Sequence, residues 1–293
     1  MPSPLQLWRR RWWRRDPDAL AAFEGLRPMV VVTGGSEGIG YALASRFAAA
    51  GCDVLLVARR AEVLAAAAER IRRDHGVEAA AVPADIAAPE AVGAIEAALA
   101  AHRAYCDVLV NNAGIGLAGP FLQQPPEAVM QLIAVNIAAL TRLTRHFLPG
   151  MRVRGRGGVL NVASLGGYVP GPYQAVYYAS KAYVLSFSEA IARETTGQGV
   201  RVTALAPGPV NTAFHARMGA DASFYRYLVA PASPEAVARA GYWAFALGLR
   251  VVVPGLLNPL LALAMRILPH RIVVPIVGVL LRLRGPNRTH VRG

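Results

Sequence analysis

Short apolar runs alternate with longer helical segments along most of the chain. The runs are rich in valine, leucine or alanine and are closed by glycine or polar residues, which is typical of buried strands. Between them, apolar residues recur at the three- and four-residue spacing of a helix that packs one face on a core. The strands are predicted at 29–35, 53–60, 77–86, 106–114, 157–164 and 200–208. The main helices are predicted at 41–51, 61–76, 89–103, 126–151 and 174–197.

This alternation predicts a parallel sheet with helices on both faces, because each parallel connection must cross back over the sheet. We expect an α/β, doubly wound domain of the Rossmann type from about residue 26 to residue 247. Residues 1–25 are a basic, tryptophan-rich arm, and residues 248–293 are an apolar extension flanked by arginines. Ligands of such sheets bind beyond the carboxyl ends of the strands, so functional residues should lie there.

The composition is that of a folded protein with unevenly distributed charge. Of the 293 residues, 54% are hydrophobic and 17% are charged, which favours a globular core over disorder. The formal net charge of +13 comes mainly from arginines near the two ends. A nucleic-acid binder would interleave arginines with aromatics along one face, so we expect no nucleic-acid partner. Cys52 and Cys106 lack metal-ligand spacing, so we expect free thiols and no metal site.

Both ends of the chain have features that bear on membrane contact. The N-terminal segment lacks the apolar core and cleavage site of a secretory signal, which predicts a cytoplasmic protein. The apolar stretch 251–281 is broken by prolines and arginines before it reaches the ~18 residues of a spanning helix. It is compatible with a cover for a pocket, a subunit contact, or a peripheral contact with an anionic membrane. Five arginines beside Trp8, Trp12 and Trp13 favour the membrane contact.

A glycine-rich loop, TGGSEGIG, joins the first predicted strand to the first predicted helix. Gly34, Gly38 and Gly40 have a G-x-x-x-G-x-G spacing, which differs from the G-x-G-x-x-G fingerprint. Glycine lets the backbone turn sharply and approach a pyrophosphate, while the helix N-terminus offers free N–H groups and a positive end. This strand–loop–helix context predicts a dinucleotide site.

The end of the second predicted strand favours NADP over NAD. NAD sites usually carry an acid there for the ribose hydroxyls, but this strand ends in Ala58, Arg59 and Arg60. A guanidinium at Arg59 forks onto a 2′-phosphate, which a carboxylate would repel. Glu37 in the glycine loop weakens this preference, because an acid lies near the same phosphate. Asp85, after the third strand, is a candidate acceptor for the adenine amino group, with a helix cap as its alternative role.

The only lysine of the chain follows a cluster of tyrosines. Lys181 stands among 30 arginines, and Tyr177 and Tyr178 precede it by four and three residues, so either can share its helix face. A phenol titrates near pH 10, and a nearby ammonium would lower that pKa. Lysine is a compact point charge that can release its proton, whereas arginine is a bulky planar group that keeps its proton. The pair is therefore a candidate acid–base site.

Together these features resemble the short-chain dehydrogenase/reductase family over about residues 28–215. The motifs are TGGSEGIG at 33–40, NNAG at 111–114, Asn136 in AVNIAAL, Ser164 in NVASLGG, Y-x-x-x-K at 177–181 and PGPVNT at 207–212. The family's serine precedes its tyrosine by about a dozen residues, which selects Tyr177 over Tyr178. The apolar C-terminal stretch resembles that of a bacterial branch with poorly defined substrates.

The resemblance implies an NADP-dependent oxidoreductase that transfers hydride between the nicotinamide and a carbonyl or secondary alcohol. Tyr177 would be the general acid–base, and Ser164 would orient the substrate oxygen. Lys181 would lower the pKa of Tyr177 and bind the nicotinamide ribose. Asn136 would interrupt the hydrogen bonding of its helix and hold a water of the proton relay. A catalytically silent NADP-binding sensor or scaffold is the alternative, although it would have no need of Tyr177 and Lys181 together.

The residues predicted to bind the cofactor span the whole domain. They follow from the resemblance and from the motifs described above. Asn111 and Gly114 would line the adenosine-ribose side, and residues 207–212 would hold the carboxamide. The full set is Gly34, Ser36, Glu37, Gly38, Ile39, Gly40, Arg59, Asp85, Ile86, Asn111, Ala113, Gly114, Tyr177, Lys181, Pro207, Gly208, Val210 and Thr212.

Two further expectations concern the substrate and the assembly. Residues 213–233 match the substrate lid of the family, and their aromatic side chains suggest a small apolar carbonyl or alcohol substrate. These aromatics are Phe214, Phe224, Tyr225 and Tyr227. Helices 127–148 and 175–195 commonly pair across a two-fold axis in the family, which implies a homodimer or homotetramer.

Overall fold

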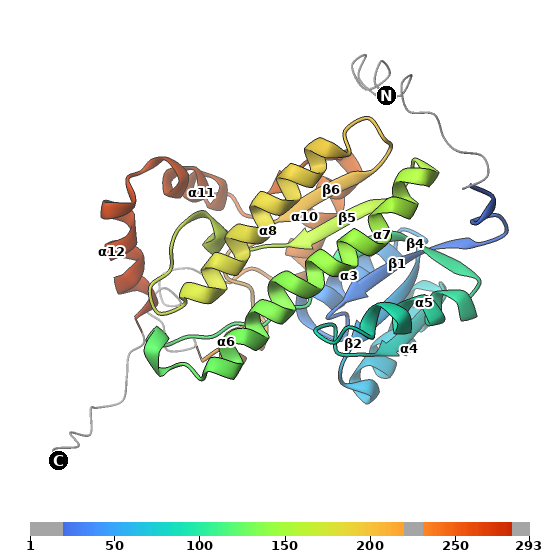
Figure 1. Cartoon of the computed structure of the whole chain (residues 1–293), viewed down its shortest axis with the longest axis horizontal. Coiled ribbons are helices and arrows are strands. Elements are labelled where there is room, and N and C mark those ends of the chain that lie inside the picture. The colour runs from blue at the N-terminus through green and yellow to red at the C-terminus, as the bar shows by residue number, and fades with distance from the viewer. Residues whose placement is uncertain (1–19, 220–230, 283–293) are drawn as a thin grey trace.

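The computed structural model describes residues 20–219 and 231–282, which build a seven-stranded parallel sheet (Figure 1). Its strands are β1 (Arg27–Thr33), β2 (Asp53–Ala58), β3 (Ala79–Pro83), β4 (Ala104–Asn111), β5 (Gly158–Val162), β6 (Arg201–Leu205) and β7 (Val251–Val252). They follow the order β3-β2-β1-β4-β5-β6-β7, and each neighbouring pair is parallel. The chain reverses direction across the sheet between β1 and β4, which is the switch point of a doubly wound fold. The predicted fold class is confirmed.

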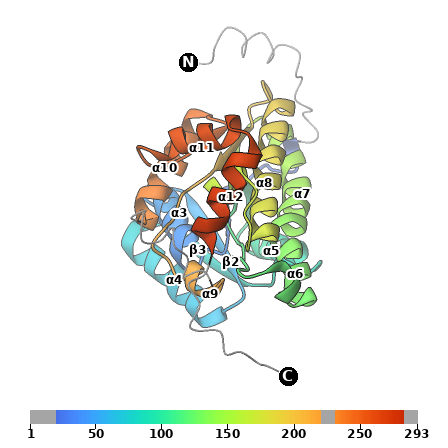
Figure 2. The ribbon, with the colours of Figure 1, turned by 90° about the vertical axis from the view of Figure 1, so that its left-hand side faces the viewer.

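Helices cover both faces of the sheet, as Figure 2 shows from the side. One layer consists of α3 (Gly38–Ala48), α4 (Ala61–His75) and α10 (Pro234–Leu247). The other layer consists of α5 (Ala91–Ala101), α7 (Leu140–Arg154) and α8 (Ala175–Glu194). The remaining elements are η1 (Phe121–Gln123), α6 (Pro126–Ile133), η2 (Ala134–Ala139), η3 (Leu165–Tyr168), α9 (Phe214–Arg217), α11 (Asn258–Ile267) and α12 (His270–Leu281).

The apolar run of β1 supplies two cores at once. Successive side chains of a strand point to opposite faces, so Val30 and Val32 pack with α3, α4 and α10, whereas Met29 and Val31 pack with α5 and α7. All four side chains are buried. A strand covered on both faces needs a continuous apolar run, which is why the sequence shows no alternation there.

The structure differs from the predicted elements in two places. Strand β7 pairs with β6 but lies beyond residue 247, so the sheet continues into the segment predicted as an extension. Its two residues are too short to leave a periodic signal. The predicted helix 126–151 is built from α6, the π-helical segment η2 and α7 in direct succession. Among the described residues, no helix has the length and apolar character needed to span a membrane.

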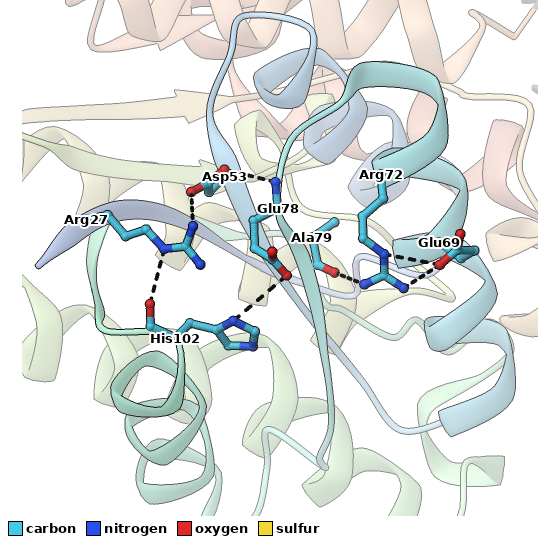
Figure 3. A network of polar contacts seen from close by, with 7 residues as sticks. All are labelled: Arg27, Asp53, Glu69, Arg72, Glu78, Ala79 and His102. Carbon is cyan, nitrogen blue, oxygen red and sulfur yellow. Dashed lines mark hydrogen bonds and ion pairs between the residues drawn. The ribbon is translucent and has the colours of Figure 1, made fainter.

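Polar contacts join the amino ends of β1, β2 and β3 at the edge of the sheet opposite the carboxyl ends (Figure 3). Arg27 pairs with Asp53 across 3.3 Å, and Asp53 Oδ1 accepts the Glu78 N–H at 3.0 Å. Arg27 Nε also donates to the His102 carbonyl at 3.1 Å. Such solvent-exposed ion pairs contribute only about 0–1 kcal/mol each. They lie at the starts of the strands, away from the carboxyl ends where ligands of such sheets bind.

The turn from β1 into α3 depends on the missing side chain of Gly40. A β-carbon at this position would overlap the Gly34 carbonyl oxygen and Asn112 Nδ2. We expect Gly40→Ala to lower the free energy of unfolding by about 1–3 kcal/mol, because backbone must move to admit the methyl group. Equilibrium unfolding in urea measures the effect.

Gly93→Ala is the matched control for this substitution. Gly93 lies within α5, and a β-carbon there meets no atom within 4 Å. Alanine is the better helix former, so this variant should be stabilised by up to about 1 kcal/mol. Unchanged stability of Gly40→Ala would contradict the packing described for the turn.

Candidate functional site

The carboxyl ends of the strands open into a large cavity of about 870 Å³. Ligand sites commonly have about 300–1,000 Å³, so this volume suits a dinucleotide with part of a substrate. Most of the predicted site residues line it. They are Gly34, Ser36, Glu37, Gly38, Ile39, Arg59, Asp85, Ile86, Ala113, Gly114, Ser164, Tyr177, Lys181, Pro207, Gly208, Val210 and Thr212. Gly40, Asn111 and Asn136 are not among the lining residues.

Asn112, and not the predicted Asn111, faces the cavity. Asn111 is the last residue of β4, and its amide nitrogen donates within the buried sheet to Asn161 Oδ1 (2.9 Å) and Thr144 Oγ1 (3.0 Å). Asn112 Nδ2 donates to the carbonyls of Thr33 (3.0 Å) and Gly34 (3.1 Å) and so holds the glycine loop. The alternation of side chains along a strand separates these neighbours, and this signal could have identified Asn112.

The glycine loop and the start of α3 form a cradle for phosphate. Gly34 and Gly38 have φ of +64° and +57°, a left-handed conformation that favours glycine. Glu37 at the N-cap of α3 makes no side-chain capping bond, and the first turn contains no acid. The free N–H groups and the positive end of α3 therefore remain available beside the cavity, where Gly38 and Ile39 lie. These residues fit the diphosphate of a dinucleotide.

Two arginines at the mouth of the cavity balance the negative charge of Glu37. Its carboxylate pairs with Arg60 at 2.8 Å and with Arg217 of α9. Partial burial raises the pKa of Glu37, but the hydrogen bonds from both arginines outweigh burial and hold that pKa below its ordinary value. Arg59 is exposed and, within the described residues, makes no hydrogen bond or ion pair. Because Glu37 pairs with Arg60 and Arg217, the Arg59 guanidinium remains open to a ligand.

Asp85 lines the cavity and also has a local structural role. Its Oδ1 accepts the N–H of Ala87 at 3.0 Å, which closes the turn after β3. This bond is of the capping type that was predicted as the alternative, although α5 itself begins later, at Ala91. The contact leaves the second carboxylate oxygen of Asp85 for a ligand.

The side chains of Tyr177 and Ser164 line the same cavity, where Ser164 influences the pKa of the Tyr177 hydroxyl. The Ser164 hydroxyl also accepts the Gly166 N–H at 3.1 Å, which fixes its position at the start of η3. Burial raises the pKa of the Tyr177 hydroxyl to about 12, and this effect outweighs that of Ser164, which lowers the pKa. Tyr178 also lines the cavity, but its ring packs against Gly166 and Gly171. The two tyrosines, equivalent by spacing to Lys181, thus have different surroundings.

Lys181 is buried beside Tyr177 but does not tune its pKa in the predicted way. Its Nζ donates to the Val162 carbonyl at 2.9 Å and lies 5.8 Å from the centre of the Tyr177 ring. Burial lowers the pKa of Lys181 to about 8. Burial therefore shifts both groups toward their neutral forms, and the amine loses its proton at a lower pH than the phenol. The predicted lowering of the Tyr177 pKa is absent from this structure, because desolvation dominates both groups.

Asn136 lies in the π-helical segment η2, so the predicted irregularity of its helix is present. Its Oδ1 accepts the Ile115 N–H (2.9 Å), and its Nδ2 donates to the Ile115 carbonyl (2.9 Å) and to Ser180 Oγ (3.0 Å). A β-carbon on Gly114 would lie 3.3 Å from Asn136 Oδ1 and 3.5 Å from Lys181 Nζ. The side chain thus holds the loop after β4 against the buried amine, and a relay water would have to bind elsewhere on Asn136.

Two segments near the cavity were predicted only loosely. Phe214 of α9 lies 5.6 Å from the Tyr177 ring, measured between ring centres. The other aromatic residues of the predicted lid, Phe224, Tyr225 and Tyr227, lie outside the described residues. The arginines and tryptophans of the N-terminal arm and the last three arginines of the chain also lie outside them. The C-terminal extension lines the cavity through Asn258, Leu261, Met265, Val277, Leu280 and Leu281. Of its three predicted roles, a cover for the pocket is therefore present.

The burial of Lys181 predicts a pH-dependent stability. Because its pKa falls from 10.5 to about 8 on folding, the unfolded chain binds more protons between these values, and stability must rise with pH. Relative to Lys181→Met, which has no titrating group, the wild type should gain about 2 kcal/mol between pH 7 and pH 9.5. Urea unfolding of both proteins at each pH measures this difference. A constant difference would show that the amine is not desolvated.

The chain is similar to several known proteins. Residues 28–223 match the family model for short chain dehydrogenases. The 3beta-hydroxysteroid dehydrogenase 1 of Eggerthella lenta is 38% identical over 200 residues, 66% of this chain and 74% of the relative. A very-long-chain 3-oxoacyl-CoA reductase of Anas platyrhynchos is 35% identical over 207 residues, 69% of this chain and 66% of the relative. Across the curated relatives the match spans 52–74% of their length, and for most of them less than two thirds.

A solved structure supports the same relationship. The short-chain dehydrogenase from Sphingobium yanoikuyae, in complex with NADPH, superposes with a TM-score of 0.69 at 34% identity. The superposition covers 78% of this chain and 87% of the other. Because the family model spans more than half of the sequence, the chain belongs to the short-chain dehydrogenase/reductase family of oxidoreductases.

Proposed function

We propose that the protein is an NADP(H)-dependent oxidoreductase that interconverts a carbonyl group and a secondary alcohol on an apolar substrate. The observation that carries this proposal is that Ser164, Tyr177 and Lys181 line one cavity together with the free N-terminus of α3. When bound, the nicotinamide would supply or accept the hydride.

The chain's own residues would manage the proton of this reaction. With a pKa of about 12, Tyr177 is fully protonated near neutral pH and can donate its proton to a carbonyl oxygen. Ser164 offers a second hydroxyl beside it, so an oxygen placed between the two would be polarised and oriented. Lys181, with a pKa of about 8, exchanges its proton near neutrality and can restore that of the phenol. The protonated phenol is the form that carbonyl reduction requires.

The preference for NADP rests on the charges at the mouth of the cavity. Glu37 is held by Arg60 and Arg217, so its charge is balanced, and Arg59 remains as an open cation at the end of β2. A guanidinium binds a phosphate with two parallel hydrogen bonds. The relative from Sphingobium yanoikuyae was solved with NADPH, which supports the same choice.

The substrate class follows from the apolar wall on the other side of the cavity. Phe214 stands beside Tyr177, and Leu261, Met265 and Val277 face the same space. The names of two relatives refer to a hydroxysteroid and to a very-long-chain 3-oxoacyl-CoA, whose steroid skeleton and acyl chain are apolar. We therefore propose an extended apolar ketone or aldehyde as the substrate.

The proposal extends to assembly and location. Members of the family are commonly oligomeric. Helices α7 and α8 lie side by side on one face of the sheet (Figures 1 and 2) and are the proposed contact of a homodimer or homotetramer. The proposed location is cytoplasmic.

Replacing each of the two adjacent tyrosines tests the catalytic assignment. Tyr177→Phe should bind NADPH with unchanged affinity but reduce turnover by about 10²–10⁴-fold, the usual contribution of a general acid. Tyr178→Phe is the matched control and should keep activity within a few-fold. A screen of long-chain aldehydes, 3-oxoacyl thioesters and steroid ketones supplies the substrate, and the absorbance of NADPH measures turnover. Retained activity in Tyr177→Phe would refute the assignment, and NADPH binding without any turnover in the wild type would favour a silent sensor.

Reversing the charge of Arg59 tests the choice of cofactor. Arg59→Asp should weaken NADPH relative to NADH by at least about tenfold, because a charge-assisted bond to phosphate contributes more than about 1.4 kcal/mol. Arg70→Asp on the exposed side of α4 makes the same change in net charge away from the cavity and should leave the ratio unaltered. Titration calorimetry with both nucleotides measures the ratio. An unchanged preference in Arg59→Asp would remove the case for NADP.

A further inference from the structure

The last helix of the described chain is apolar on two opposite sides. Val273, Val277 and Leu281 of α12 are buried and form a cluster with Val169. Ile272, Ile276 and Val279 form a second stripe at the same helical spacing, and they are 50%, 55% and 67% exposed. A helix at the surface of a protein normally keeps polar residues on its outer side. The outer stripe of α12 therefore indicates a partner other than water.

The exposed apolar surface continues along α11 and the turn before it. Leu256, Leu260, Leu263 and Ile267 follow one another at intervals of four, three and four residues and are each more than half exposed. Within the described residues, ten of the 17 exposed large apolar side chains fall in the segment 256–279. An apolar patch concentrated in this way marks an interaction site. Together, the outer stripes of α11 and α12 are termed the outer C-terminal face.

All the charged side chains within the segment that forms this face are positive. Residues 248–282 contain Arg250, Arg266, Arg271 and Arg282 but no aspartate or glutamate. Arg266 and Arg271 are exposed at the corner between α11 and α12, and Arg282 is exposed at the far end of α12. Figure 2 shows both helices at the front of the molecule, turned outward from the sheet. Apolar side chains bordered by arginines suit the boundary between anionic headgroups and acyl chains.

A second copy of the chain fits this face less well. A two-fold contact places the same patch on both partners, so the arginines of one copy would face those of the other with no acid between them. Like charges juxtaposed in an interface oppose association. An anionic lipid surface has the complementary charge.

We propose that the outer C-terminal face docks on an anionic lipid surface without crossing it. The inner side of the same helices lines the cavity through Leu261, Met265 and Val277. Docking would therefore bring the apolar wall of the cavity against the bilayer, from which an apolar substrate could enter. The entry of substrate from the bilayer rests on the proposed function, whereas docking itself does not.

Sedimentation of the full chain with vesicles tests the docking. Leu260→Ser, Ile267→Ser and Ile276→Ser are combined in one variant, because these residues lie on the outer C-terminal face and do not line the cavity. The wild type should bind vesicles of phosphatidylcholine with phosphatidylserine more tightly than vesicles of phosphatidylcholine alone. The triple variant should bind these vesicles at least about tenfold more weakly, because it no longer transfers three apolar side chains from water into the bilayer. Leu122→Ser, at a 94% exposed leucine of η1, is the control and should bind like the wild type.

Several outcomes would overturn the docking proposal. Equal binding of the triple variant and the wild type would place any lipid contact elsewhere on the chain. Equal binding to both kinds of vesicle would remove the role of the arginines. Conversion of a wild-type dimer into a monomer by the triple substitution, measured by light scattering, would make the face a subunit contact.

Turnover separates this proposal from that of the enzymatic function. The triple variant should reduce a water-soluble ketone at the wild-type rate but a ketone dissolved in vesicles more slowly. Absence of turnover in the wild type with both ketones would count against the proposed function and leave the vesicle result valid. Equal slowing of both reactions would overturn the delivery of substrate from the bilayer.

Discussion

The connection between the ends of β1 and β4 is the constraint on which the site depends. Thr33 closes β1, and its Oγ1 accepts the backbone N–H groups of Asn112 and Ala113, both at 3.1 Å. The Asn112 side chain returns two hydrogen bonds to the carbonyls of Thr33 and Gly34. These strands flank the switch point, so the bonds hold the glycine loop and the loop after β4 at a fixed separation. The phosphate cradle and the wall around Lys181 are built on these two loops.

Desolvation governs the chemistry that this frame supports. Lys181 and Tyr177 are separated by a single helical turn, and a favourable ion pair between them could have been expected. In a buried site, however, removing either charge from water costs more than the distant partner returns, so the pKa of the lysine falls and that of the tyrosine rises. The Val162 carbonyl, 2.9 Å from the lysine nitrogen, compensates part of this penalty. A proton donor and a proton reservoir thus stand side by side without forming a salt bridge.

The fold and most of the site could be predicted from the sequence because they depend on local pattern. Continuous apolar runs, glycines and helical periodicity follow from contacts within a strand or a helix, and they located β1 to β6. The choice between Tyr177 and Tyr178 did not follow from spacing, since both share a face with Lys181. It required the family resemblance.

The features that escaped prediction depend on contacts between distant parts of the chain. The ion pair of Glu37 with Arg217 joins residues 180 positions apart, so an acid that seemed to oppose a phosphate is in fact balanced. The burial that raises the Tyr177 pKa is likewise a property of the assembled cavity. Nor does any local pattern show that α11 and α12 fold back over the site, because their apolar residues are equally compatible with a core, an interface or a lipid surface.

The C-terminal helices therefore affect the acid–base pair without touching the reacting atoms. Met265, Val277 and Leu281 present no polar group to the cavity that also holds Tyr177 and Lys181. An apolar wall lowers the local dielectric constant and strengthens the desolvation of both ionisable groups. If this wall moved away and water entered, the pKa of Lys181 would return toward 10.5 and that of Tyr177 toward 10. Two helices far along the chain thus contribute to the burial that shifts the pKa values of Lys181 and Tyr177.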